Sequence, residues 1–203
     1  MYIRKPLRKY IDDVAAKKPI PGGGSVSALC ACLAVALSSM VVNFTLGNKR
    51  YGAVQAKIKQ LLKDNEVIRK KLVVLVDKDT IVYNKLNSAL KLPCGNKKRN
   101  YLIQKCLKQA ALVPFDICRL TLSAMGLCNQ IAKIGNANLI TDAGCTAYLL
   151  DSAYYCGQLN VRINLKFIKD KAFTRNKNRA LQEMAKKITS LKKITIRHVE
   201  GSL

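Results

Sequence analysis

The amino-acid sequence predicts an all-α fold, a single-domain bundle of long antiparallel helices that takes up residues 1–203. Apolar residues recur at helical spacing over long segments, while the apolar–polar alternation typical of strands is almost absent. The helical segments are separated by Gly, Pro and Asn, which favour turns. No repeat or linker divides the chain, so we expect one domain with its own core.

Three helices are expected in the first part of the chain. A short helix covers Leu7–Ala16 and ends before a turn that contains two prolines. The next helix extends from Ser25, which can cap it, to about Leu46, and Gly47 ends it. A long helix or helix pair then covers Val54–Leu90 and stops at the proline and glycine that follow.

Further helices are expected in the second part of the chain. One covers Tyr101–Leu112, and Pro114 opens the next, which reaches Ile134. Gly135 then suits a left-handed position at the helix end. The last core helix starts near Thr141 and extends to Leu165 or beyond. From about residue 170 a basic amphipathic helix follows, and its apolar side carries Leu181, Met184, Ile188 and Leu191.

Positive charge dominates the composition, with 36 Lys and Arg against 12 Asp and Glu and a formal net charge of +24. Such a chain attracts anions: nucleic acid, an anionic membrane surface or a multiply charged small substrate. Aromatic residues are sparse and Trp is absent, which argues against platforms for base stacking. A non-catalytic basic helical protein that binds nucleic acid, or one whose C-terminal helix binds a membrane surface, stays as an alternative.

The eight cysteines form no Cys-x-x-Cys pair, and most lie singly among apolar residues. This is typical of reduced thiols in a cytoplasmic protein, which is the localisation we expect. His198 is the only histidine and lies in the basic tail. We therefore expect neither a histidine-containing zinc site nor a Ser-His-Asp triad.

The run from Val26 to Val42 is about long enough to span a membrane. Its residues are mostly Ala, Ser and Cys, which are weakly hydrophobic, and we expect no second run of this kind. We therefore place it in the interior of the bundle and expect no membrane partner.

Asp79 is the candidate catalytic residue. It lies in the middle of a helical face that collects Leu72, Leu75, Val76, Val82, Tyr83, Leu86, Ala89 and Leu90. Asp77 is expected to point the other way. A carboxylate on an apolar face is costly unless it is paired, and burial raises its pKa, as a proton shuttle requires. The structural alternative is an Asp that a neighbouring helix end or a lysine satisfies.

The PGGGS stretch, with Gly22 to Ser25, is the second candidate site. No Gly-Lys-Ser/Thr follows and no strand precedes it, so it is neither a Walker loop nor a dinucleotide fingerprint. Glycines let the backbone approach a ligand or another helix, and the helix start behind them offers free N–H groups to an anion. We expect a packed helix start with a ligand at its mouth.

Two polar segments lie further along the chain. KIGNANLITDAG is typical of a turn between helices, in which Asn138 or Thr141 caps and Asp142 favours the positive helix end. Asn160 and Asn164 are four residues apart and share a helical face. Their amides could bridge helices or bind the edge of a heterocycle.

Four stretches, in order and at fitting separations, resemble the cyclodeaminase/cyclohydrolase family, which acts on folates. They are PGGGSVSALCACLAVALSSMVVNFTLGNKRY, VDKDTIVY, GNANLITD and NVRINL, and the resemblance covers roughly residues 5 to 170. It differs mildly at Thr80 and Val82, where the family pattern has alanines, and at Thr141, where it has serine.

The resemblance implies an all-helical domain that dimerises, a folate site near the glycines and no metal. Asp79 corresponds to the catalytic carboxylate of the family. The residues expected to bind substrate are Gly22, Gly23, Gly24, Ser25, Lys49, Tyr83, Asn136, Asp142, Asn160 and Asn164.

The expected reaction is hydrolysis of 5,10-methenyltetrahydrofolate to 10-formyltetrahydrofolate, with no cofactor besides the tetrahydrofolate substrate. The alternative within the same family is the cyclodeaminase reaction, in which formimidoyltetrahydrofolate loses ammonia. A substrate with a polyglutamate tail would suit the charge of the basic chain, and the expected partner is a second copy in a homodimer.

Overall fold

The computed structural model describes residues 1–93 and 95–203, and within these ranges it contains helices and no strand. The helices are α1 (Leu7–Ala15), α2 (Gly23–Thr45), α3 (Gln55–Leu90), α4 (Arg99–Ile134), α5 (Ile140–Lys166) and α6 (Lys171–Glu200). Short 3₁₀ turns are η1 (Tyr2–Arg4), η2 (Lys49–Val54) and η3 (Ala137–Leu139). The predicted all-α fold is confirmed.

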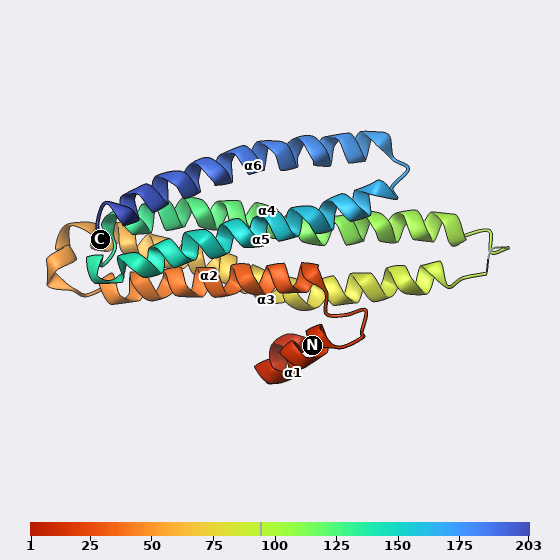
Figure 1. The fold of residues 1–203 in the computed structure, drawn as a ribbon, viewed down its shortest axis with the longest axis horizontal. Helices are drawn as coiled ribbons and strands as arrows, with labels where there is room; N and C mark the ends of the chain where they lie inside the picture. Colours follow the sequence, from red (N-terminus) through yellow and green to blue (C-terminus); the bar gives the residue numbers. More distant parts are fainter. Residues whose placement is uncertain (94) are drawn as a thin grey trace.

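Four long helices, α2 to α5, form an antiparallel bundle in which each helix packs against the next and α5 returns to α2. The amphipathic helix α6 lies along α4 and α5, so that it covers one side of the bundle (Figure 1). α3 and α4 extend beyond the start of α2, and η1 packs against α3. The glycine-rich start of α2 therefore lies partway along the bundle rather than at its end.

Small residues bring α2 into the centre of the bundle. Ala28, Ala31 and Ala34 are fully buried, so neighbouring helices pack close to the α2 backbone. Large aliphatic side chains such as Leu72 and Ile117 fill the main core. The predicted apolar side of α6 joins the same core.

Pro114 does not open a helix, contrary to the sequence prediction, because α4 runs through it without a break. A proline has no N–H, so the carbonyl four residues earlier, that of Ala110, loses its helical hydrogen bond. The side chain of Asn164 in α5 donates to this carbonyl oxygen at 3.2 Å. A tertiary contact thus replaces the missing backbone bond.

Two predictions about helix ends are wrong. Gly135 is not left-handed, since its φ is −76°. It is needed for close packing, because a Cβ there would lie 2.7 Å from the carbonyl oxygen of Ile131. Ser25 is not a cap, since α2 already starts at Gly23. Gly47 does adopt a positive φ of 72°, which suits its predicted place after the helix.

Within residues 1–93 and 95–203, two helices are long and apolar enough to cross a membrane, α2 and α4, so the expectation that no second such run exists is wrong. In each, half or more of the most apolar window is buried inside the bundle, 61% in α2 and 50% in α4. Core helices of proteins outside membranes commonly have this composition.

Candidate active site

Three helices meet at the glycine-rich start of α2. A Cβ on Gly24 would lie 2.1 Å from Oδ1 of Asp79 in α3, and one on Gly23 would lie 3.0 Å from Nδ2 of Asn160 in α5. These side chains can approach the α2 backbone only because both positions are glycine. The structure therefore brings Asp79 and Asn160 to the same helix start, as the sequence predicted for a site at PGGGS.

The surroundings of Asp79 adjust its acidity. Burial raises the pKa of its carboxyl from 3.8 to about 6, while a hydrogen bond from the backbone N–H of Ser25 lowers it. None of the ion pairs in the described chain involves Asp79. An acid that titrates near neutral pH, with no basic residue bound to it, can both accept and return a proton.

Ser25 and Tyr10 hold the glycine turn in place. The buried Ser25 Oγ donates to the carbonyl oxygen of Val76 at 2.9 Å, so in its 3.0 Å contact with Tyr10 it accepts the phenolic proton. Burial raises the pKa of Tyr10, which keeps this hydroxyl a donor. The network ties α1, α2 and α3 together next to Asp79. Nothing in the local sequence singles out Tyr10, because its partner lies in another helix.

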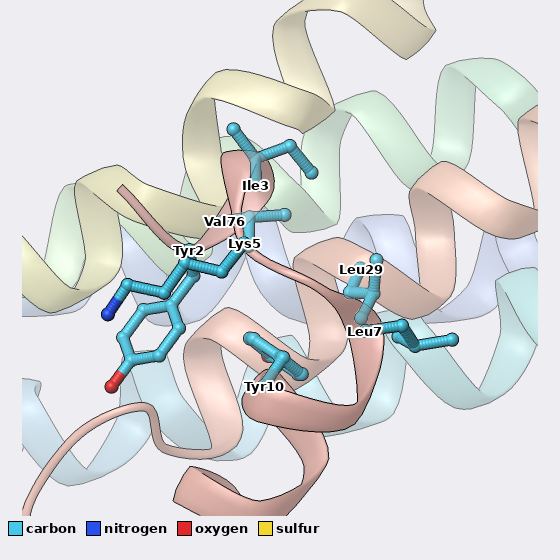
Figure 2. A pocket seen from close by; sticks show the side chains of 7 residues that line it. All are labelled: Tyr2, Ile3, Lys5, Leu7, Tyr10, Leu29 and Val76. Carbon is cyan, nitrogen blue, oxygen red and sulfur yellow. The ribbon is translucent and has the colours of Figure 1, made fainter.

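Tyr10 also lines a cavity of about 170 Å³. Figure 2 shows its lining, in which Tyr10, Leu7 and Leu29 face one another while the polar ends of Tyr2 and Lys5 point away. Asp79 does not line this mainly apolar cavity. We therefore assign it to the packing of the N-terminal segment.

Asp77 is buried, contrary to the expectation that it points away from the core, and only 3% of its surface is exposed. The N-terminal turn η1 covers this side of α3, and the backbone N–H of Tyr2 donates to Oδ1 of Asp77. Oδ2 has no partner among the described residues. Thr80 is also buried and donates to the carbonyl oxygen of Asp77 at 2.8 Å.

The remaining predicted residues near Asp79 differ in their contacts. Tyr83 lies one helical turn after Asp79 and is 41% exposed, so its ring is available to a ligand. Asn160 donates to the carbonyl oxygen of Cys156 at 2.8 Å. Asn164 donates to the backbone of Asn160 and of Ala110, which gives it a structural role in the bundle.

Three predicted site residues, Lys49, Asn136 and Asp142, lie at the opposite end of α2. The backbone N–H of Asn136 donates to Oγ1 of Thr45, the last residue of α2, at 2.9 Å. A helix of 23 residues, as α2 is, spans about 35 Å at roughly 1.5 Å per residue. Within one chain the predicted site therefore divides into two groups, which we call the Asp79 cluster and the Asn136 cluster.

The Asp79 cluster consists of Gly22, Gly23, Gly24, Ser25, Asp79, Tyr83, Asn160 and Asn164. The Asn136 cluster consists of the predicted residues Lys49, Asn136 and Asp142.

The Asn136 cluster is built on a tightly hydrogen-bonded turn. Tyr51 donates to Oδ1 of Asn136 at 3.4 Å and accepts from the backbone N–H of Ala137 at 2.9 Å. Oδ1 of Asn136 also accepts from the backbone N–H of Asn138, so Asn136 caps η3. The predicted caps Asn138 and Thr141 do not cap α5. Asp142 does lie in the first turn of α5, as predicted.

Metal-binding and thiol groups are scattered in the described chain. No group of three His, Cys, Asp or Glu side chains in residues 1–93 and 95–203 is close enough to hold a metal ion. The cysteines described there are free thiols, and Cys94 lies outside the described residues.

The sequence and the fold resemble those of known proteins. The chain is 32% identical to a methenyltetrahydrofolate cyclohydrolase of Methylorubrum extorquens over 180 residues, which is 87% of this chain and 86% of that one. It is 33% identical to the crystal structure of formiminotetrahydrofolate cyclodeaminase from Thermotoga maritima, with a TM-score of 0.92 and coverage of 99% and 98%.

Longer relatives contain the same region. The chain is 31% identical to the formimidoyltransferase-cyclodeaminase of Sus scrofa over 84% of its own length but only 32% of that protein, so it spans about a third of these relatives. The sequence profile described as Formiminotransferase-cyclodeaminase matches residues 6–184. The chain therefore belongs to the formiminotransferase-cyclodeaminase family.

Proposed function

We propose that this protein is a methenyltetrahydrofolate cyclohydrolase, which hydrolyses 5,10-methenyltetrahydrofolate to 10-formyltetrahydrofolate. The observation that carries the proposal is the Asp79 carboxyl, with a pKa of about 6, held against the start of α2 beside Asn160. The similarity to the Methylorubrum extorquens cyclohydrolase over most of both chains supports this choice of reaction.

Asp79 acts first as a base in this mechanism. Water attacks the amidine carbon that bridges N5 and N10 of the substrate, and ionised Asp79 takes the proton that the water loses. The absence of side chains at Gly23 and Gly24 lets the carboxyl of Asp79 and the amide of Asn160 lie directly against the start of α2. In this proposal the ring of Tyr83, which is exposed, and the amide of Asn160, which lies against Gly23, contact the pterin.

Asp79 then acts as an acid. The tetrahedral carbon releases N5, and the proton held by Asp79 passes to that nitrogen. The hydroxyl on the same carbon loses its proton to water as the formyl C=O forms, so the products are 10-formyltetrahydrofolate and one released proton. One carboxyl can perform both steps because a pKa near neutral makes neither the gain nor the loss of a proton costly.

The cyclodeaminase reaction is the second candidate, supported by the similarity to the Thermotoga maritima enzyme. In that reaction N10 attacks the formimino carbon and ammonia leaves, which again needs one proton shuttle. Absorbance distinguishes the two, since methenyltetrahydrofolate disappears in the hydrolysis and appears in the deamination. Turnover of methenyltetrahydrofolate alone supports the proposal, turnover of formimidoyltetrahydrofolate alone replaces it, and turnover of neither contradicts both.

We also propose that the protein is a homodimer that pairs through the exposed side of α2 and α5. α2 contains no charged residue, and α5 contains no Lys or Arg before Arg162, although the chain has 36 such residues. Leu33 is 57% exposed on α2, and Leu159 is 64% exposed on α5. Two chains of charge +24 repel each other. The electrostatic repulsion between two copies is smallest where they pair through this apolar side, which lacks cations.

Sedimentation of the wild-type chain and of a Leu159→Glu variant tests this pairing. We expect a dimer for the wild type and a monomer for the variant, whereas Val74→Glu on α3, 62% exposed, should stay dimeric. A monomeric wild-type chain would contradict the proposal.

The positive charge is proposed to assist capture of folates that carry polyglutamate tails. Turnover of a polyglutamylated folate should then fall more steeply with added salt than turnover of the monoglutamate. Equal salt sensitivity would remove this part of the proposal. The free thiols of the described chain support a reducing location such as the cytoplasm.

A further inference from the structure

The side of the bundle formed by α3 and α4 is uncovered. α6 packs against α4 and α5 (Figure 1), so among the described elements no helix lies over the outer side of the α3/α4 pair. Three hollows follow one another along this side, with volumes of about 410, 470 and 620 Å³. Residues of both helices line each hollow, and the first two share Lys71, Arg119 and Leu120. Together they form one long groove, which we call the α3/α4 groove.

Six exposed residues of α3 line this groove at alternating intervals of four and three residues. They are Val67, Lys71, Val74, Lys78, Ile81 and Lys85. These intervals are typical of the contact seam of a coiled coil, because an average spacing of 3.5 keeps the side chains turned toward a partner helix. The three apolar members of the seam are 51%, 62% and 47% exposed. The seam extends over about five helical turns, and no described helix covers it.

α4 has a second row with the same alternating intervals along the other edge of the groove. Its members are Lys105, Gln109, Leu112, Asp116, Arg119 and Ser123. All of them except Leu112 line one of the three hollows, and Leu112 is itself 36% exposed. A third helix laid in the groove would therefore contact α3 and α4 along its whole length, as amphipathic helices do when they bind between two others.

Positive charge accompanies the apolar seam. Four lysines of the groove form no ion pair within residues 1–93 and 95–203, whereas Arg119 is paired with Asp116 at 3.2 Å. These lysines are Lys71, Lys78, Lys85 and Lys105. A helix that covers the groove removes water from their ammonium groups, which is costly unless carboxylates face them. The occupant that fits must therefore combine apolar residues with Asp or Glu.

We propose that the α3/α4 groove is the docking site for an acidic amphipathic helix of another protein. Its apolar residues lie against Val67, Val74 and Ile81, and its carboxylates face the lysines that alternate with them. The chain itself does not provide such a helix, because it has 12 acidic residues against 36 basic ones, and a second copy of charge +24 is repelled. This inference is independent of the proposed folate reaction.

The apolar seam favours a helix over other anions. Nucleic acid would neutralise the lysines, but its phosphates gain nothing from three exposed aliphatic side chains. A membrane surface is flat, whereas the groove is a hollow between two parallel rows of side chains. Only an occupant that is itself a rod, with apolar and acidic residues on one side, matches both the shape and the chemistry.

A synthetic peptide of about 21 residues, or three heptads, tests the proposal. It has Leu and Glu alternating at seam positions and carries a fluorescent label, and its binding to the full-length chain is measured by anisotropy. The wild-type chain should bind it at least about 10-fold more tightly than a scrambled peptide of equal composition, because scrambling keeps the charge and removes the seam. Val74→Glu should weaken binding at least about 10-fold, since it places a carboxylate in the centre of the seam.

A charge-matched pair of variants separates the groove from the overall charge of the chain. Lys71→Glu with Lys78→Glu should weaken peptide binding at least about 10-fold, because two attractive pairs become repulsive. The control is Lys186→Glu with Lys187→Glu on α6, which makes the same change in net charge at two exposed lysines and should weaken binding less than about 2-fold. Circular dichroism checks that both double variants are folded.

Four results would overturn the proposal. No binding of the heptad peptide by the wild-type chain would show that water, and not a helix, covers the groove. Equal binding of the scrambled peptide, or equal losses in the two double variants, would show attraction by net charge alone. Tighter binding of a DNA duplex or of phosphatidylserine vesicles, lost in the Lys71→Glu and Lys78→Glu chain, would assign the groove to nucleic acid or to a membrane.

Discussion

Replacing Asp79 by Asn should make the protein more stable while it stops turnover. The rise in the pKa of this carboxyl from 3.8 to about 6 means that the folded state resists its ionisation. At roughly 1.36 kcal/mol per pKa unit, the ionised carboxylate costs about 3 kcal/mol of folding free energy at neutral pH. Asn is neutral, has the same shape and can accept the N–H of Ser25.

The gain must depend on pH in a defined direction. Well below pH 3.8 the carboxyl is protonated in both folded and unfolded chains, so variant and wild type should be equally stable. As pH rises through 4 to 6 the unfolded wild-type chain ionises first, so wild-type stability falls relative to the variant. Above pH 7 the difference should be complete, with about 3 kcal/mol as its ceiling because Asp79 keeps some contact with water.

Urea unfolding at pH 5.0, 6.0 and 7.5, at equal protein concentration, measures this difference. Asp12→Asn is the matched control, since the Asp12 side chain is 63% exposed and its loss should change stability by less than about 0.5 kcal/mol. Turnover by Asp79→Asn should fall about 100-fold or more. A variant that is no more stable than the wild type at pH 7.5, or a gain independent of pH, would refute the reasoning.

Further substitutions test individual contacts. Gly24→Ala puts a Cβ 2.1 Å from Oδ1 of Asp79, so the carboxyl must turn away and turnover should fall at least about 10-fold with the fold intact. The control is Gly52→Ala, whose Cβ would meet no atom within 4 Å and which should leave turnover unchanged. Equal turnover by the two variants would contradict the packing of Asp79 against Gly24. Asn164→Ala should cost about 1–2 kcal/mol of stability by leaving the Ala110 carbonyl unpaired. In a Pro114→Ala background the backbone N–H of residue 114 can bind the Ala110 carbonyl, so the stability cost of Asn164→Ala should shrink by about 0.5 kcal/mol or more. Thermal unfolding of the two single variants and the double variant measures this difference. Strictly additive effects of the two substitutions would show that the Asn164 side chain does not replace the missing backbone bond.

The catalytic side of α3 could be predicted from local spacing because helical periodicity alone decides which residues share a face. Asp79 followed from that rule and from the family resemblance together. Asp77 did not, because its burial depends on Tyr2, 75 residues away in sequence, folding across α3. A helical wheel contains no information about a segment that returns from a distant part of the chain.

Local rules for Pro and Gly were likewise overruled by tertiary contacts. Pro114 was expected to start a helix, yet α4 continues because Asn164 in another helix supplies the missing donor. Gly135 was expected to be left-handed, yet its role is to let the chain pass close to Ile131. The order of the family motifs along the chain did not predict that Asn136 and Asp79 lie at opposite ends of α2. Sequence order does not determine the distance between two residues in space.

The central claim is that Asp79 moves the proton, and the pH profile of kcat/KM for methenyltetrahydrofolate tests it most directly. If ionised Asp79 takes the proton from water, kcat/KM should rise with pH around an apparent pKa near 6, the value that burial gives this carboxyl. In Asp79→Asn the residual rate should lose this dependence while folate binding by calorimetry is retained. An unchanged profile in the variant, with turnover near that of the wild type, would contradict the account.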